Sequence, residues 1–480
     1  MAVEPAAEEP QGTPYPQDRF VLLLIILVLL VALFGIAQRL PGPEAEGPQF
    51  SEDILQSDMA MKIAYASERW QEILPPSQRR QMEILRDRQH LSAIDSYEQV
   101  VRDDPSLQNL RRLLIVEYPR KRAAVIAKLA ARGKNLQAEV AMWKAIYVSK
   151  KPLSPQESAR YSTRIRRLDL GWYQSLALAD LYARAGSAKE ASAERDLAVA
   201  SAVRAMTLLA VLLAVLGSLG FFGIFVITWY VSAERMRRIP DRVPPDNQGL
   251  VAGYFLEAFI VYLGIVIGTQ VLAGLALLSV KNPLSPRTMV FATAGVYTLG
   301  GILSAIYLAY RLRAAGWSWK SVGLTSRNPL LDVGWGIMGY AAALPLLLVA
   351  SYLSRVLTRF IPTPSNPVVP IFLQANTLLE RLVILGLTVI VAAFFEELFF
   401  RGVLFHSFQA KWGPRLGLVL SAAVFASVHP LPLGFLPIFV LGYVLATLLY
   451  RRGSLLPCMV THGLNNCVAF LVLSILVGSP

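Results

Sequence analysis

Long apolar runs separated by short polar connections dominate the hydrophobic pattern of this chain of 480 residues. Several runs reach or exceed the roughly 20 residues that an α-helix needs to cross a lipid bilayer. The candidate spans are 20–37, 205–231, 250–280, 288–310, 330–354, 382–405, 416–429, 434–450 and 455–477. Of these, 250–280 is long enough to tilt or bend, and 416–429 is short for a complete span. The pattern predicts an all-α, polytopic transmembrane helical bundle of about eight or nine spans.

The pattern changes between the first two spans, where apolar residues recur at helical intervals among charged ones. A linker rich in Pro, Gly and Glu (39–48) leads into this segment, and we expect a soluble helical domain over 38–204. Within it, Trp172–Ala200 resembles one tetratricopeptide-type hairpin that turns at Gly186. Repeat arrays usually need three or more units, so an ordinary helical bundle is the favoured interpretation. We expect this domain to bind a protein partner or present a substrate, since its one histidine, His90, has no cluster of ligands around it.

The predicted organisation has six parts. They are an N-terminal tail, a transmembrane anchor, the soluble helical domain, a second transmembrane helix, a basic linker and a C-terminal membrane domain (1–19, 20–37, 38–204, 205–231, 232–249 and 250–480).

Charge bears on orientation more than on binding partners. Basic connections at 235–242, 311–327, 411–415 and 451–452 fall on alternate ends of successive spans, as the positive-inside rule expects for cytoplasmic loops. This places 38–204 outside the cytoplasm. If the source is a bacterium, the membrane that the protein spans is the plasma membrane. The net charge of +13 is accounted for by these loops and by solvated helix faces, so we expect no nucleic-acid partner. Both cysteines, Cys458 and Cys467, lie in the last apolar segment, which excludes a disulfide framework.

Two adjacent carboxylates, Glu396 and Glu397, lie inside an apolar stretch that begins at Leu382 and first meets a basic residue at Arg401. Ionisable groups in a hydrocarbon environment are costly and usually persist because they perform a task. Glu397 and Arg401 are one helical turn apart, so the arginine can neutralise and orient this carboxylate. Glu396, about 100° round the helix, is left to face another partner.

Two further polar faces occur in separate apolar segments. His429 shares a helix face with Phe425, and His462 shares one with Asn466, because each pair is four residues apart. A single intramembrane histidine is more often a hydrogen-bonding residue between packed helices than a catalytic one. His429, His462 and Glu396, however, lie in three separate helices that each present one polar face. This pattern favours a common site.

The stretches "EELFFR" (Glu396–Arg401), "FASVH" (Phe425–His429) and "HGLNN" (His462–Asn466) resemble, in order, the EExxxR, FxxxH and HxxxN motifs of the CPBP (Abi) intramembrane proteases. This group includes the type II CAAX prenyl endopeptidases, and the resemblance covers about 250–477. It implies an intramembrane endopeptidase in which Glu396 and His429 activate water. It further implies that His462 and Asn466 stabilise the oxyanion. By this resemblance the catalytic set is Glu396, Glu397, His429, His462 and Asn466, with Arg401 and Phe425 as orienting residues.

The resemblance leaves the metal open. Glu396, His429 and His462 are a sufficient donor set for a catalytic zinc with one open position. The same side chains also suit a metal-free mechanism, in which a carboxylate raised in basicity by its apolar pocket acts as general base. No HExxH helix is present in the sequence, so that type of metalloprotease is not indicated.

The expected substrate is a peptide or protein at the lipid bilayer, lipidated or not. Two other functions fit the pattern. One is an inactive membrane scaffold that acts through 38–204, and the other is a transporter that uses a glutamate and a histidine as a proton relay.

Overall fold

The computed structural model describes residues 17–37, 52–103, 105–168, 170–235, 252–280, 284–360, 372, 375, 377–429 and 432–477. Over these residues the chain is helical and contains no strand, which confirms the all-α prediction. The chain divides into two compact units, one of which contains the apolar helices and the other the helices between the first two apolar runs. Most of the predicted tail (1–19) and basic linker (232–249) lies outside the described residues.

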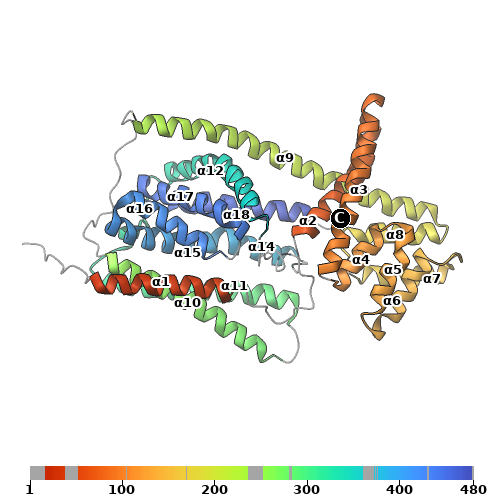
Figure 1. Ribbon diagram of the computed structural model, residues 1–480, viewed down its shortest axis with the longest axis horizontal. Helices are drawn as coiled ribbons and strands as arrows, with labels where there is room; N and C mark the ends of the chain where they lie inside the picture. Colours follow the sequence, from red (N-terminus) through yellow and green to blue (C-terminus); the bar gives the residue numbers. More distant parts are fainter. Residues whose placement is uncertain are drawn as a thin grey trace, which may run out of the picture. The chain divides into compact units, whose positions relative to one another are not determined.

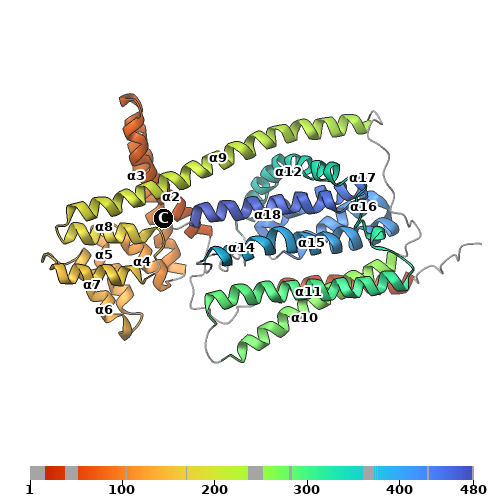
Figure 2. The ribbon, with the colours of Figure 1, turned by 180° about the vertical axis from the view of Figure 1, so that it is seen from behind.

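The membrane unit contains α1, α10, α11, α12, α14, α15, α16 and α17, together with parts of α9 and α18. Their bounds are Gln17–Ala37, Ala252–Leu278, Pro286–Ala314, Pro329–Thr358, Leu378–Gly386, Ala393–Glu396, His406–Ser427 and Phe435–Arg452, with α9 at Ala188–Arg235 and α18 at Leu456–Val477. Short 3₁₀ turns occur at Trp319–Val322 and Pro432–Gly434. Figures 1 and 2 show α14–α18 between α9 and α12 on one side and α1, α10 and α11 on the other.

Seven helical stretches among the described residues are long and apolar enough to cross a membrane, which confirms a polytopic membrane protein. The difference from the nine predicted segments has two causes. The segments 382–405 and 416–429 belong to one stretch, Leu378–Ser427, which is interrupted where Gly413 adopts φ +79° before Pro414. The segment 20–37 forms the apolar helix α1, which is not among the seven.

The connections between spans pack against each other at one end of the membrane unit. Arg451, near the end of α17, donates a hydrogen bond of 2.7 Å to the hydroxyl of Tyr230 near the end of α9. The backbone N–H of Leu455 donates to the carbonyl of Gly323 at 2.8 Å, which joins the α17–α18 turn to the 311–327 connection. Three of the basic segments, predicted to share one side of the membrane, are thus attached to helix ends that lie together.

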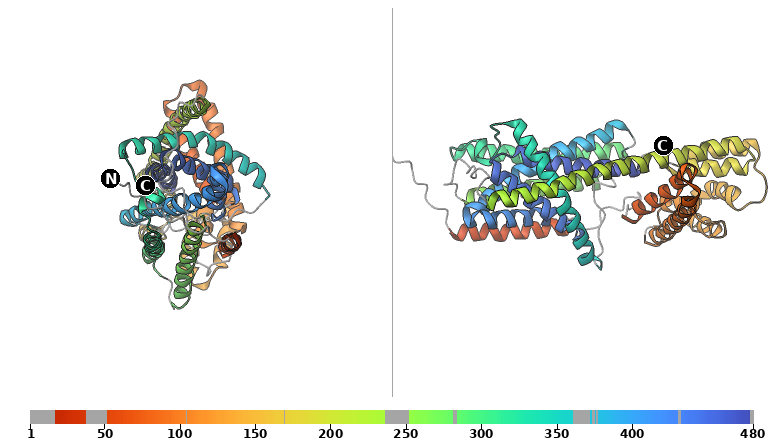
Figure 3. Two further views of the ribbon diagram at one scale, coloured as in Figure 1. Left: turned by 90° about the vertical axis from the view of Figure 1, so that its left-hand side faces the viewer. Right: turned by 90° about the horizontal axis from the view of Figure 1, so that it is seen from above.

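The other unit is built mainly from α2 to α8 and the first part of α9. Their bounds are Glu52–Ile73, Pro76–Asp103, Leu107–Val116, Pro119–Ala130, Gln137–Tyr147, Pro155–Arg166 and Tyr173–Arg184, with a 3₁₀ turn at Lys134–Leu136. From α2 to α6, successive helices pack against each other, and α7 packs against α8; Figure 3 shows this group of helices from two directions. The expected hairpin at Trp172–Ala200 is present, since α8 ends before Gly186, whose φ of +76° reverses the chain. Its second helix does not stop at the predicted boundary of 204: it is α9, which is 48 residues long and ends at Arg235.

A buried polar cluster lies in the core of this helical unit. The carboxylate of Asp58 accepts hydrogen bonds from the hydroxyls of Tyr97 and Tyr173, the latter at 2.6 Å. Both tyrosines are almost fully buried, and burial beside Asp58 raises the pKa of each hydroxyl well above its ordinary value. Both hydroxyls therefore remain protonated and able to donate at any physiological pH.

An ion pair between a buried carboxylate and a partly exposed guanidinium connects α12 to α17 in the membrane unit. The Nε and Nη2 atoms of Arg452 donate to one oxygen of Asp332 at 3.0 and 2.8 Å, and the hydroxyl of Ser326 donates to the other at 2.6 Å. Asp332 is 1% exposed, so removal of its carboxylate leaves the guanidinium without its partner. We predict that Asp332→Ala lowers the free energy of unfolding by about 3 kcal/mol, measured as thermal unfolding in detergent.

The matched control is Asp87→Ala, because Asp87 is an exposed acid paired with an exposed Arg86. Exposed ion pairs contribute little, so we expect no measurable change in this variant. Equal melting temperatures for the two variants would contradict the importance of the Asp332 pair.

Candidate active site

Glu396 and Glu397 lie where the helical backbone is irregular. A π-helical segment, Leu387–Ala392, precedes the short α15, and a second, Glu397–Phe405, follows it directly. The π-helix is rare and is frequently found at functional sites. The expected regular helix over 382–405 is thus widened on both sides of Glu396.

Glu397 is enclosed by partners from its own helix and from α18. Its Oε1 atom accepts a hydrogen bond of 3.1 Å from Nη1 of Arg401 and lies 2.7 Å from Nδ1 of His462. The side chains of Glu397 and Arg401 are 0% and 1% exposed. The guanidinium of Arg401 also lies 4.1 Å from the ring centre of Phe425. Glu397 therefore holds His462 and Arg401 in place and is closed to a substrate.

Glu396 is the more accessible of the two carboxylates. Its side chain is 15% exposed, and its Oε1 accepts a hydrogen bond of 2.8 Å from the hydroxyl of Tyr297 on α11. Its Oε2 lies 3.9 Å from Nε2 of His462. This distance is too long for a direct hydrogen bond, and polar contacts of this length are commonly bridged by water.

The ring of Phe425 packs against both His429 and His462. The Nδ1 atom of His429 lies 2.7 Å from the backbone carbonyl of Phe425, so Nδ1–H donates to it, and in the neutral imidazole Nε2 carries a lone pair. The ring centres of His429 and His462 lie 4.9 and 5.9 Å from that of Phe425, both in edge-on packing. His429 is also within electrostatic range of Glu396 and His462. The structure thus brings together the polar residues of all three motifs.

Asn466 lies one turn beyond His462 on α18 and contacts the first π-helical segment. Its Nδ2 atom donates a hydrogen bond of 2.9 Å to the carbonyl of Thr388, which uses one of the two amide N–H groups. α18 approaches this segment closely at Gly463, where a Cβ would lie 3.0 Å from the carbonyl oxygen of Val389. Asn466 is therefore fixed by the backbone and keeps one N–H for another acceptor.

A metal site is not formed by these side chains as they stand. No group of three or more His, Cys, Asp or Glu residues in the described part of the chain is placed to hold a metal ion. The proposed ligands Glu396, His429 and His462 are of the right chemical type, but their donor atoms do not converge on one point. We derive no step through a metal, and zinc dependence stays a prediction.

Tyr297 is the residue of this site that the sequence motifs do not include. It lies in a different span from any of them, 99 positions before Glu396. Gly301, four residues later on the same face of α11, is a sequence feature that indicates close helix packing near Tyr297. A Cβ at Gly301 would come within 2.4 Å of the ring of Phe395, so the absence of a side chain there lets α11 approach the residue before Glu396.

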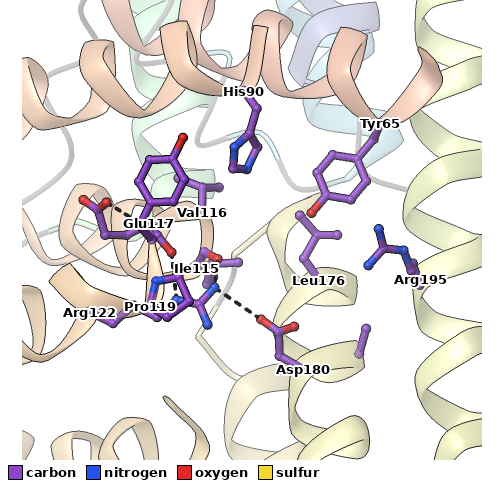
Figure 4. A pocket seen from close by; sticks show the side chains of 12 residues that line it. Tyr65, His90, Ile115, Val116, Glu117, Pro119, Arg122, Leu176, Asp180 and Arg195 are labelled. Atoms are coloured by element: carbon purple, nitrogen blue, oxygen red, sulfur yellow. Dashed lines mark hydrogen bonds and ion pairs between the residues drawn. The ribbon is translucent and has the colours of Figure 1, made fainter. Parts of the chain in front are cut away.

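A separate pocket of about 170 Å³ opens on the helical unit, as Figure 4 shows. Its arginines are offset by acids, since Arg122 lies 3.9 Å from Asp180 and Arg195 lies 3.0 Å from Glu68. His90 also lines it, with its ring edge-on to a tyrosine, and burial lowers the pKa of this imidazole. The balanced charge favours no particular class of ligand, and a partner for this domain stays a prediction.

The packing of α11 against α15 gives a test with a matched control on the same helix. We predict that Gly301→Ala lowers the melting temperature in detergent, because the added methyl group overlaps Phe395 and overpacking costs about 1–3 kcal/mol. Gly295→Ala should leave the melting temperature unchanged or slightly higher, since no atom lies within 4 Å of a Cβ there. Destabilisation of equal size in both variants would contradict a close helix contact at Gly301.

Comparison with known proteins adds to this geometry. A search of curated proteins and of solved structures gave no match to the chain. Residues 378–468 match the family model described as Type II CAAX prenyl endopeptidase Rce1-like, and this segment contains all three motifs. The chain is therefore an integral membrane protein whose segment 378–468 matches the type II CAAX prenyl endopeptidase Rce1-like family.

Proposed function

We propose that the protein is an intramembrane endopeptidase that hydrolyses a peptide bond in a membrane-associated substrate, with Glu396 as the general base. The observation that carries this proposal is the 3.9 Å gap between Oε2 of Glu396 and Nε2 of His462. The carboxylate of Glu396 is 15% exposed, His429 lies within electrostatic range of both groups, and the amide of Asn466 is fixed one turn beyond His462 on α18. This is the set of groups that addition of water to a peptide carbonyl requires.

In the proposed reaction, a water molecule is held by Glu396 and by Nε2 of His429. As its oxygen bonds to the carbonyl carbon of the substrate, the water gives one proton to Glu396. The negative charge that develops on the carbonyl oxygen is stabilised by the remaining N–H of Asn466 and by His462. Glu396 then passes its proton to the peptide nitrogen, the C–N bond breaks, and a carboxylic acid and an amine form. The acid gives its remaining proton to the amine, so that a carboxylate and an ammonium group are released.

His462 is suited to donate a hydrogen bond to the oxyanion because its Nδ1 contacts Glu397. Glu397 accepts from Nδ1 and can hold a protonated imidazole as an ion pair, which leaves Nε2–H to point at the reaction centre. Arg401 shares the same oxygen of Glu397, and the other oxygen is buried with no hydrogen-bond partner among the described residues. Because the side chain is 0% exposed, this carboxylate has no access to a substrate water and does not act as a second base. The two neighbouring glutamates thus take different roles, which their surroundings decide.

Substrate access is proposed from the cytoplasmic side. The second π-helical segment leads from Glu397 to Gly402, which packs against the carbonyl of Val322 in the basic 311–327 connection. By the positive-inside rule this end of the unit faces the cytoplasm. The predicted domain 38–204 would then lie outside and bind a protein partner. The substrate class includes lipidated tails, and the family description suggests prenylated ones.

The test is cleavage of quenched fluorescent peptides, with and without a C-terminal farnesyl group, by the purified full-length protein in detergent. We predict that Glu396→Gln and His429→Ala each lower kcat/KM at least about 100-fold, because each removes a group that holds or deprotonates water. The control is Glu257→Gln, whose carboxylate pairs with Arg311 on another part of the unit and should leave the rate unchanged.

Cleavage by Glu396→Gln at the wild-type rate would overturn the general-base role. Loss of activity on exhaustive chelation, restored by zinc, would favour the metal alternative over the metal-free reaction. No cleavage of any peptide by the wild type, combined with pH-coupled solute uptake into proteoliposomes, would favour a transporter.

A further inference from the structure

The hydroxyl of Tyr297 is the group that orients the carboxylate of Glu396. Tyr297 lies on α11, outside the matched segment 378–468, and none of the three motifs includes it. We propose that it is a positioning residue for hydrolysis, which presents one oxygen of Glu396 to the reaction centre. This inference rests on the proposed function and extends the site to a helix outside the matched segment.

The two oxygens of Glu396 have different environments. Oε1 accepts the hydrogen bond of 2.8 Å from Tyr297, whereas Oε2 faces Nε2 of His462 at 3.9 Å. The terminal torsion of a glutamate is broad and has no strong preference of its own, so an unbonded carboxylate would turn between several orientations. The bond to Tyr297 selects the orientation in which Oε2 faces His462. A hydrogen bond to an ionised group is also stronger than a neutral one.

The backbone keeps Tyr297 at this distance. Gly301 lies one turn after Tyr297 and allows α11 to contact Phe395, the residue that precedes Glu396. One residue earlier, a Cβ at Gly300 would lie 3.0 Å from the hydroxyl oxygen of Thr269 on α10, so α11 is closely packed on that side too. The hydroxyl is therefore delivered by a helix packed on two faces, and the carboxylate meets a partner that is already in place.

The same helix offers a matched control. Tyr307, ten residues after Tyr297, also lies beside a glutamate: its hydroxyl is 3.4 Å from Oε1 of Glu257. Glu257 is held in addition by Arg311 at 3.1 Å and belongs to none of the three motifs. Tyr307→Phe therefore removes a Tyr–Glu contact from the same helix without touching the site.

The experiment measures kcat and KM for the fluorescent peptides with wild type, Tyr297→Phe and Tyr307→Phe, together with their melting temperatures. We expect Tyr297→Phe to lower kcat about 10- to 100-fold, the loss that corresponds to one hydrogen bond to a charged group. KM should change less than about twofold, because the substrate is not bound by Tyr297. Tyr307→Phe should keep kcat within about twofold of wild type.

A second pair of variants separates positioning from general packing. In Glu396→Asp the carboxylate withdraws from Tyr297 by one methylene group, so the added change Tyr297→Phe should have almost no further effect on kcat. Full additivity of the two changes would place the effect of Tyr297 elsewhere and overturn the proposal.

Each remaining outcome decides a different point. A Tyr297→Phe protein that keeps kcat within twofold of an active wild type overturns the positioning role alone. The same holds if it loses activity only together with its melting temperature. A wild type that cleaves no peptide overturns the proposed function, and the positioning role falls with it.

Discussion

The arrangement of the membrane unit depends on one buried interaction, the contact of Glu397 with Arg401 and His462. A carboxylate taken out of water without a partner costs more than the few kcal/mol by which most proteins are stable. Here Arg401 supplies the opposite charge from the same helix and His462 supplies an N–H from α18. Arg401 in turn lies over the ring of Phe425 on α16 and reaches a carbonyl on α17 at Gly442. Four segments of the chain are thus fixed relative to each other by the need to satisfy one charge.

This arrangement explains why two adjacent glutamates can do different work. Glu397 is closed in by its partners, and its role is to hold α18 and the outer nitrogen of His462 in position. Glu396 has a single hydrogen bond and a side chain that is partly accessible. The π-helical segments on both sides provide the geometry, since a wider turn changes which direction each successive side chain takes. A regular helix would also separate the two side chains, because neighbouring residues lie about 100° apart around its axis.

Much of the architecture could be predicted from the sequence, because hydrophobic runs determine which segments are buried in lipid. The all-α bundle and the hairpin at Gly186 follow from helical periodicity and one glycine, and both are observed. The pairing of Glu397 with Arg401 follows from four-residue spacing. The continuity of α9 could not be predicted, because a helix has the same backbone in water as in lipid and only its side chains change. Neither could the π-helical turns, since no residue type marks them, nor the contact of Tyr297 with Glu396, which depends on how helices pack across 99 positions.

The two histidines illustrate what the sequence leaves undecided and the structure adds. Both have Nδ1 engaged inward and Nε2 directed elsewhere, but their inner partners differ. The backbone carbonyl of Phe425 accepts a hydrogen bond from Nδ1–H of His429 and carries no negative charge that would balance a positive charge on the imidazole. A carboxylate can balance a positive charge on His462. Two imidazoles beside one phenylalanine are therefore suited to unlike tasks, one to hold a water molecule through a lone pair and the other to donate toward a developing oxyanion. A zinc ion bound by His429 and His462 would need a lone pair on Nε2 of each imidazole. His462 would therefore have to lose the proton on Nε2 before Glu397, hydrogen-bonded to Nδ1, could support it as a metal ligand.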